Sequence, residues 1–287
     1  ACTRLAVPEA FGLRDQVMAA INEQYLAQYF KGMESVLEQR LEQALPRVAK
    51  DGDVSQLFGC AAGRPVVVVA GGPTADNQFE WIRSKRQDII VVAVSTALHP
   101  LQRAGIVADV AVIFDPQPRM VQHVTGLRGG SCQQTPLVYL PTVHPDVLDK
   151  WSGPRLAAYQ DIPRFRRIHR KLPRGYLFCS GTVTHAAVDL AVQMGADPIV
   201  LVGADFSNPF GRSHASGATL TTDASTEGHR QPHVANGQGE TVPSTLSLIS
   251  YLRDLETYIQ RRPGTRFFNT GREGAEIQGA PWLKVAA

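Results

Sequence analysis

The chain has 287 residues, of which 44% are hydrophobic and 19% charged, and its formal net charge is +3 at pH 7. This composition is typical of a globular protein and excludes a disordered chain, and so small a net charge does not by itself indicate a nucleic-acid partner. No apolar run reaches the roughly 18 residues that a membrane span needs, and the first residues lack the basic and apolar segments of a signal peptide, so we expect a cytoplasmic protein.

Two features of the chain bear on its origin and compartment. It begins with Ala rather than Met, which is compatible with a piece of a longer parent. Its four cysteines (Cys2, Cys60, Cys132 and Cys179) are far apart and form no Cys-x-x-Cys pair. This spacing predicts reduced, buried thiols rather than a disulfide framework or a zinc site.

Residues 13–45 place apolar side chains at helical spacing, with Glu, Gln, Lys and Arg between them. The pattern predicts an amphipathic helix, or a pair of helices broken near Gly32, that ends at Pro46. Such a long apolar face must pack on the main domain or on a second copy of the chain, so a homo-oligomer is one expectation. We expect an N-terminal helical segment over residues 1–63.

From residue 64 the pattern changes to short β-branched runs alternating with helices. Apolar runs at 65–70, 89–94, 110–114, 137–140 and 199–202 predict strands buried on both faces. Helical patterns cover 97–104, the segment from Thr182 to Gly195, and 244–262, and residues 267–270 read as a short final strand. The alternation predicts an α/β fold for residues 64–287, a doubly wound, mostly parallel, Rossmann-like sheet.

Small, hydroxylic or acidic residues follow most of the predicted strands. Ligands of parallel α/β sheets bind at the carboxyl ends of the strands, so we expect one shared site there. Gly71 to Thr74 and Ser180 to Thr182 each precede a predicted helix, where backbone N–H groups could hold a phosphate. The second motif could instead be a simple N-cap. Asp115 and Asp205 could bind ribose hydroxyls or a divalent metal, or could cap loops. The candidate binding residues are Gly71, Gly72, Pro73, Thr74, Ser95, Asp115, Ser180, Gly181, Thr182 and Asp205.

Several common nucleotide motifs are absent. The chain has neither the Gly-x-Gly-x-x-Gly fingerprint nor an acidic residue after the second strand, which argues against NAD, and it has no P-loop. The one Asp-x-Asp spacing, Asp51 to Asp53, precedes the first strand and is discounted as a metal site.

Residues 206–243 are rich in Gly, Ser, Thr, Asn and His, and we expect a polar loop that closes over a ligand. His214, His229 and His233 lie in it. A general base is favoured over zinc ligation for these histidines, with His214 and His233 as the candidates and His185 as a reserve. Seven basic residues between Arg155 and Arg174 predict either a solvated helix face or a patch for an anionic surface.

Four segments and a looser fifth carry a resemblance to a known family: Val67 to Thr74, Phe114 to Gln117, Ser180 to Thr184, Gly203 to Phe206 with His214 downstream, and residues 269–279. In these segments the sequence resembles the motility-associated-factor (Maf) glycosyltransferases. That family is similar to bacterial lipo-oligosaccharide sialyltransferases. The resemblance implies a CMP donor carrying a sialic-acid-like (nonulosonic) sugar and a hydroxyl acceptor, either flagellin Ser/Thr or a surface glycan. It further implies a loop histidine as base, with no metal cofactor and no specific nucleic acid.

Two alternatives stay open. A pterin diphosphokinase of the MptE-like superfamily would use ATP and Mg²⁺, with Asp115 and Asp205 as metal ligands. A flagellar or envelope assembly factor would bind a sugar nucleotide without turning it over. The first motif reads Gly-Gly-Pro-Thr rather than the usual Gly-Pro-Ser, and the chain is far shorter than typical Maf proteins, which leaves the acceptor open.

Overall fold

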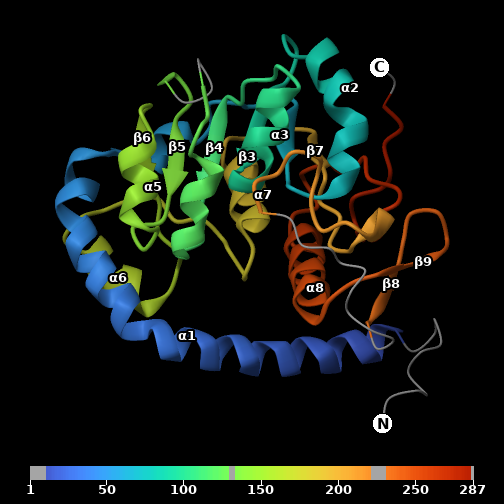
Figure 1. Ribbon diagram of the computed structural model, residues 1–287, viewed down its shortest axis with the longest axis horizontal. Coiled ribbons are helices and arrows are strands. Elements are labelled where there is room, and N and C mark those ends of the chain that lie inside the picture. Colours follow the sequence, from blue (N-terminus) through green and yellow to red (C-terminus); the bar gives the residue numbers. More distant parts are fainter. Residues whose placement is uncertain (1–10, 129–132, 221–230, 286–287) are drawn as a thin grey trace.

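The computed structural model describes residues 11–128, 133–220 and 231–285. Its centre is an eight-stranded sheet with the order β1-β6-β5-β4-β3-β2-β7-β10, and every neighbouring pair is parallel (Figure 1). The predicted doubly wound α/β fold is therefore confirmed. The strands are β1 (Gly52–Asp53), β2 (Val66–Val69), β3 (Ile90–Val94), β4 (Val110–Ile113), β5 (Leu137–Tyr139), β6 (Arg155–Ala157), β7 (Ile199–Val202) and β10 (Phe267–Asn269).

The β-branched runs form the central strands because both faces of the sheet are covered. All four valines of β2 are fully buried. Their partners in β7 are also buried, as are three of their four partners in β3, and Ile90 is half-buried. The helix α7 packs across β2, β3 and β4. From β2 the chain adds β3, β4, β5 and β6 in one direction, then returns to place β7 and β10 on the other side of β2. The direction of winding therefore reverses between β2 and β7, and open α/β sheets bind their ligands at such a point.

The connecting helices are mostly short. The α-helices after the first are α2 (Phe79–Ser84), α3 (Leu98–Arg103), α5 (Pro145–Lys150), α6 (Pro163–His169), α7 (Val183–Gln193) and α8 (Leu246–Gln260). The 3-10 helices are η3 (Val54–Leu57), η4 (Pro73–Gln78), η5 (Ser95–Ala97), η6 (Pro118–His123) and η7 (Pro209–Gly211). The predicted strand end before Ser180 is an extended segment in which Tyr176 forms a single parallel bridge with Tyr159. Among the described residues, no helix is long and apolar enough to cross a membrane.

The N-terminal helix is longer than the sequence pattern predicts. α1 (Phe11–Lys50) continues through Gly32 and Pro46 and runs beneath the domain, where it packs against α8 (Figure 1). Pro46 lies one turn before the helix end, so its missing N–H removes a single hydrogen bond, and the flanking Glu, Gln, Leu and Arg residues favour helix. The segment before residue 64 also contributes β1, which pairs with β6 in the main sheet.

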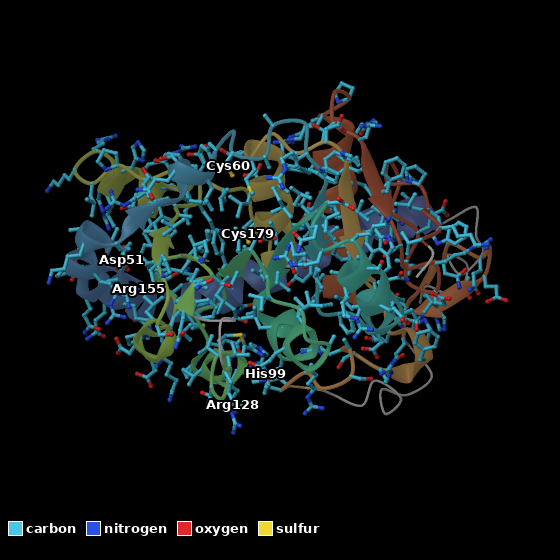
Figure 2. The ribbon with its side chains drawn as sticks, turned by 90° about the horizontal axis from the view of Figure 1, so that it is seen from above. Asp51, Cys60, His99, Arg128, Arg155 and Cys179 are labelled. Carbon is cyan, nitrogen blue, oxygen red and sulfur yellow. The ribbon has the colours of Figure 1, made fainter. Side chains whose placement is uncertain are left out.

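Much of the basic stretch from Arg155 to Arg174 holds α1 against the domain. The Arg155 guanidinium lies 3.1 Å from the Asp51 carboxylate just after α1, and Figure 2 shows the two side chains next to each other. Arg167 lies 3.4 Å from Glu38 of α1, and Arg174 donates to the carbonyl of Val48. Arg164 lies 4.0 Å from Glu34, and Arg166 pairs with Asp161. Contact of this stretch with an anionic surface stays a prediction.

The polar segment after Phe206 contains strands that its composition did not reveal. β8 (His233–Ala235) and β9 (Thr241–Pro243) form an antiparallel hairpin in which Val234 and Val242 are buried. Each strand has three residues and one buried valine, so the alternation of apolar and polar residues is too short to predict a strand. His229 lies outside the described residues, as do Cys2 and Cys132. Cys60 and Cys179 are free thiols, and Cys60 is exposed rather than buried as expected.

Candidate functional site

A cavity of about 180 Å³ opens at the point where the winding of the sheet reverses. Its walls come from the segments that follow β2, β3 and β7, from the start of α7, and from the turn around residue 214. This is the edge at which the sequence predicted a shared site. The lining residues are Ala70, Gly71, Gly72, Val94, Thr96, Thr182, Val183, Thr184, Gly203, Ala204, Asp205, Phe206, Ser207, Ser213, His214 and Leu248.

The two glycines after β2 are required by close contacts within the protein. A Cβ atom at position 71 would overlap the Thr96 side chain, and one at position 72 would lie 2.5 Å from both the Gly203 carbonyl oxygen and Asp205 Oδ2. The loop after β2 therefore lies directly against the ends of β3 and β7. Gly71 and Gly72 line the cavity, whereas Pro73 begins η4 and is buried.

Asp205 holds this loop in place. Its Oδ2 accepts the backbone N–H of Thr74 at 3.0 Å, and its Oδ1 accepts the Thr74 hydroxyl. Burial raises the pKa of Asp205 to about 6, although both hydrogen bonds from Thr74 act in the opposite direction. The two polar groups of Thr74 that could have met a phosphate are therefore engaged by a buried carboxylate.

The segment before α7 is also held by internal hydrogen bonds. Ser180 donates its hydroxyl to Asp254 at 2.6 Å and its backbone N–H to His185 Nδ1 at 3.2 Å. Gly181 has a φ of 81°, and a Cβ there would overlap the Tyr251 ring, so glycine is required. Thr182 is the N-cap residue of α7 and lines the cavity.

His185 does not suit the role of a base. It is fully buried, and burial lowers its pKa to about 4. Nδ1 accepts the Ser180 N–H, so Nε2 carries the proton and donates to the Tyr251 carbonyl at 2.9 Å. Nε2 thus joins α7 to α8, Nδ1 joins α7 to the segment before it, and the arrangement is structural.

Ser95 and Asp115 follow β3 and β4 at the same edge. Ser95 is buried in η5, and the next residue, Thr96, lines the cavity instead. The Asp115 carboxylate accepts the backbone N–H of Gln117 at 2.9 Å, and burial raises its pKa. Asp205 is occupied by Thr74, and no group of three or more His, Cys, Asp or Glu side chains within the described ranges is arranged to hold a metal.

Of the two candidate bases, His214 and His233, only the first lines the cavity. His214 lines the cavity, and its Nδ1 lies 2.9 Å from Ser213 Oγ. Burial and the nearby Arg119 guanidinium lower its pKa, so the imidazole is neutral at pH 7. His233 begins β8, where its Nδ1 lies 3.0 Å from the Gln231 carbonyl oxygen, and it is not among the residues that line the cavity.

Three further basic residues lie beside His214, and the sequence analysis did not select them. His99 belongs to α3, and Arg119 and His123 belong to η6. His123 is buried, and its pKa is lowered to about 4 by burial first and then by the charges of His214, His99 and Arg119. The sequence offers one indication of these residues: they follow the second and third predicted strands, and the carboxyl ends of parallel strands lie at one edge of the sheet.

The protein is thus a doubly wound α/β protein with a cavity at the carboxyl ends of β2, β3 and β7. The chain matches the family described as 6-hydroxymethylpterin diphosphokinase MptE-like over residues 39–210, more than half of its length, and it belongs to that family. The resemblance to the Maf and MptE-like group that the strand-end motifs predicted is thereby confirmed.

A solved structure has the same fold. The Maf glycosyltransferase from Magnetospirillum magneticum AMB-1 superposes with a TM-score of 0.69 and 21% sequence identity. The match covers 86% of this chain and 38% of that one, so this chain spans well under half the length of that glycosyltransferase. No curated protein sequence matches this chain.

Proposed function

We propose that the protein is a glycosyltransferase that moves a sialic-acid-like sugar from a CMP donor to a hydroxyl acceptor. The observation that carries the proposal is His214, a neutral imidazole in the wall of the cavity at the switch point of the sheet. A base for a hydroxyl acceptor needs a free lone pair on a group that is unprotonated at working pH. When Nδ1–H donates to Ser213 Oγ, the lone pair is on Nε2.

We propose that the transfer needs no metal. In this proposal the donor binds at the ends of β2, β3 and β7, where Gly71, Gly72 and Thr182 line the cavity. The base accepts the proton of the acceptor hydroxyl as its oxygen attacks the anomeric carbon and the bond to the CMP phosphate breaks. The similarity to a Maf glycosyltransferase supports this reading. Flagellin or a surface glycan is the proposed acceptor.

The family description favours one alternative, an ATP-dependent pterin diphosphokinase. That reaction would use Mg²⁺ on Asp115 and Asp205, which in this structure accept hydrogen bonds from Gln117 and Thr74. A flagellar or envelope assembly factor that binds a sugar nucleotide without turnover is the other alternative.

Nucleotide binding separates these functions. The melting temperature should rise more with CMP than with UDP or ADP at equal concentration, because a ligand that binds only the folded state stabilises it. A larger rise with ATP and Mg²⁺ would place the diphosphokinase first. CMP binding without any CMP release from a CMP-sialic acid, in the presence of flagellin or of glycan acceptors, would favour the assembly factor.

The matched pair His214→Ala and His233→Ala tests the base. Transfer from the CMP-sugar should fall about 10²–10⁴-fold in His214→Ala, the range for loss of a general base, with CMP affinity little changed. His233→Ala should keep near-full activity because its side chain does not line the cavity. Equal activity in both variants and in the unmodified protein would refute a histidine base in this segment.

A further inference from the structure

Thr96 lines the cavity from a fixed position after β3. It is the middle residue of η5, between Ser95 and Ala97, which are both buried. Its own side chain is half-buried and belongs to the wall of the cavity. Within the part of the chain that the structure describes, the Thr96 hydroxyl has no hydrogen-bond partner. A hydroxyl group in this position can both donate to a ligand and accept from it.

Other hydroxyl groups of the cavity wall are engaged within the protein or are less accessible. Thr182 Oγ1 accepts the backbone N–H of Thr184 at 3.4 Å. Ser207 Oγ donates to a backbone carbonyl at 2.9 Å and accepts a backbone N–H at 3.1 Å. Thr184 itself is buried, with 7% of its surface exposed. Thr96 therefore offers a ligand the more accessible uncommitted hydroxyl.

The Thr96 hydroxyl and the His214 imidazole border the same small space beside Gly71. A Cβ atom on residue 71 would overlap Thr96 Oγ1 and would lie 3.3 Å from His214 Cδ2. Ala215 donates its backbone N–H to the Gly71 carbonyl at 2.8 Å, which fixes the segment that carries His214. In the ring Cδ2 is bonded to Nε2, whereas Nδ1 faces Ser213 Oγ. The ring edge nearest to Gly71 and Thr96 is therefore the one that carries Nε2.

The cavity wall suits an uncharged ligand group rather than an anion. Among the described residues, its lining includes neither Lys nor Arg, and the Asp205 carboxyl is its one acidic side chain. His214 is neutral at pH 7. Much of the remaining wall is apolar and includes Val94, Phe206 and Leu248. A phosphate or carboxylate would be poorly compensated there, whereas a ring with hydroxyl groups on apolar carbons finds both kinds of contact.

We propose that Thr96 and His214 together bind one hydroxyl group of an uncharged sugar ring. The Thr96 hydroxyl donates to the ligand oxygen, and His214 Nε2 accepts the proton of that oxygen. The inference deepens the proposed function and rests on it for the transfer step, in which the oxygen belongs to the acceptor. The two hydrogen bonds leave one lone pair of the oxygen free to attack the anomeric carbon, and Thr96 keeps its own proton. A ribose hydroxyl of the nucleotide has the same chemistry, so the probes must separate the two sources.

Three variants and two kinds of neutral probe test the hydroxyl pair. Thr96→Val keeps the shape of the side chain and removes the hydroxyl, and Thr96→Ser restores it. Thr241→Val is the matched control, because Thr241 is exposed on β9 and is not among the residues that line the cavity. Ligand-observed NMR titration measures methyl β-galactoside in the presence of CMP, for the acceptor, and cytidine against 3′-deoxycytidine and 2′-deoxycytidine, for the ribose.

Thr96→Val should weaken methyl β-galactoside binding about 5- to 50-fold, the range for losing one hydrogen bond to a neutral group in a site shielded from water. Thr96→Ser should recover most of the affinity, and Thr241→Val should not change it. In a transfer assay with CMP-N-acetylneuraminic acid, kcat/KM for the galactoside should fall by the same factor in Thr96→Val, while KM for the donor stays nearly constant. Melting temperatures show whether the variants fold.

Two results would overturn the hydroxyl pair. One is that neither neutral probe binds, and the other is that Thr96→Val binds both as tightly as the unmodified protein. The proposed function can fail separately. If the preference for cytidine over a deoxycytidine disappears in Thr96→Val, the pair stands with ribose as its ligand, and His214 is not the base for the acceptor. If galactoside binding depends on Thr96 while CMP is not the preferred nucleotide, the pair stands and the CMP-sugar reaction does not.

Discussion

Replacing Asp205 with Asn tests whether the buried carboxylate governs the pH dependence of stability. Asn keeps the shape of the side chain and removes its ionisation. Its carbonyl oxygen can still accept the Thr74 N–H, and the Thr74 hydroxyl can turn to accept from the amide. The variant should therefore fold, with the loop after β2 still held against β7.

The magnitude follows from the pKa of Asp205, which burial raises from 3.8 to about 6. The folded protein holds the proton of Asp205 more tightly than the unfolded chain does. Protonation of Asp205 therefore stabilises the folded state; this contribution is complete well below pH 3.8 and is lost as the pH rises through 6. One pKa unit corresponds to about 1.36 kcal/mol, so the loss is about 3 kcal/mol.

Urea denaturation at pH 4 and pH 7.5 measures the effect. Other carboxyl groups titrate over the same range, so the quantity to compare is the change in unfolding free energy of the unmodified protein minus that of Asp205→Asn. The unmodified protein should lose more stability on going from pH 4 to pH 7.5, by about 2.5 kcal/mol, which is slightly less than the full 3 kcal/mol because pH 4 lies just above the unfolded pKa of 3.8. Equal pH dependence in the two proteins would refute a buried, ionisable Asp205.

Asp197→Asn is a control of opposite sign. The hydrogen bond from Arg266 lowers the pKa of this exposed carboxyl, so its contribution is present at neutral pH and is lost as the pH falls. Because this folded pKa lies below 3.8, most of the contribution is still present at pH 4. Asp197→Asn should therefore reduce stability at both pH values and leave the difference between pH 4 and pH 7.5 nearly unchanged.

Three further substitutions check the packing around the site. Gly72→Ala should destabilise the fold by about 1–3 kcal/mol or more in urea denaturation, because its Cβ would lie 2.5 Å from the Gly203 carbonyl oxygen and Asp205 Oδ2; an unchanged midpoint would show that the loop can move away. Asp51→Ala should lower the free energy of unfolding by about 3–5 kcal/mol in the same measurement, since it leaves Arg155 and the Tyr139 hydroxyl without their shared acceptor. A loss below 1 kcal/mol would show that Asp51 contributes little to holding α1 against the sheet. His185→Gln should lower the melting temperature while CMP affinity per folded molecule stays constant, and loss of CMP binding in a folded variant would place His185 in the site after all.

The residue pattern alone was sufficient for the fold class and for the edge of the sheet where the site lies. Runs such as Val66 to Val69 are buried on both faces, which occurs in parallel sheets, and the positions of turns and helices between them required right-handed crossovers. The polar residues after the strands then had to meet at one edge. The strand-end motifs were also sufficient to identify the family.

Short or atypical elements could not be read from local sequence. β1 has two residues, and β8 and β9 have one buried valine each, so none shows a recognisable period. Pro46 is a helix breaker by intrinsic preference, but the surrounding helix and its packing outweigh the single lost hydrogen bond.

The roles of individual polar residues were decided by tertiary structure. Thr74 and Ser180 look available for a phosphate in sequence, yet their partners, Asp205 and Asp254, come from positions 131 and 74 residues away. His99 on α3 and His123 on η6 come to the same edge of the sheet because these helices follow adjacent strands, β3 and β4. The sequence by itself determined that a polar site would form at the carboxyl edge of a parallel sheet. Only the folded chain decided which polar groups form hydrogen bonds with one another and which line the cavity, because hydrogen bonds between distant segments depend on how the strands are ordered.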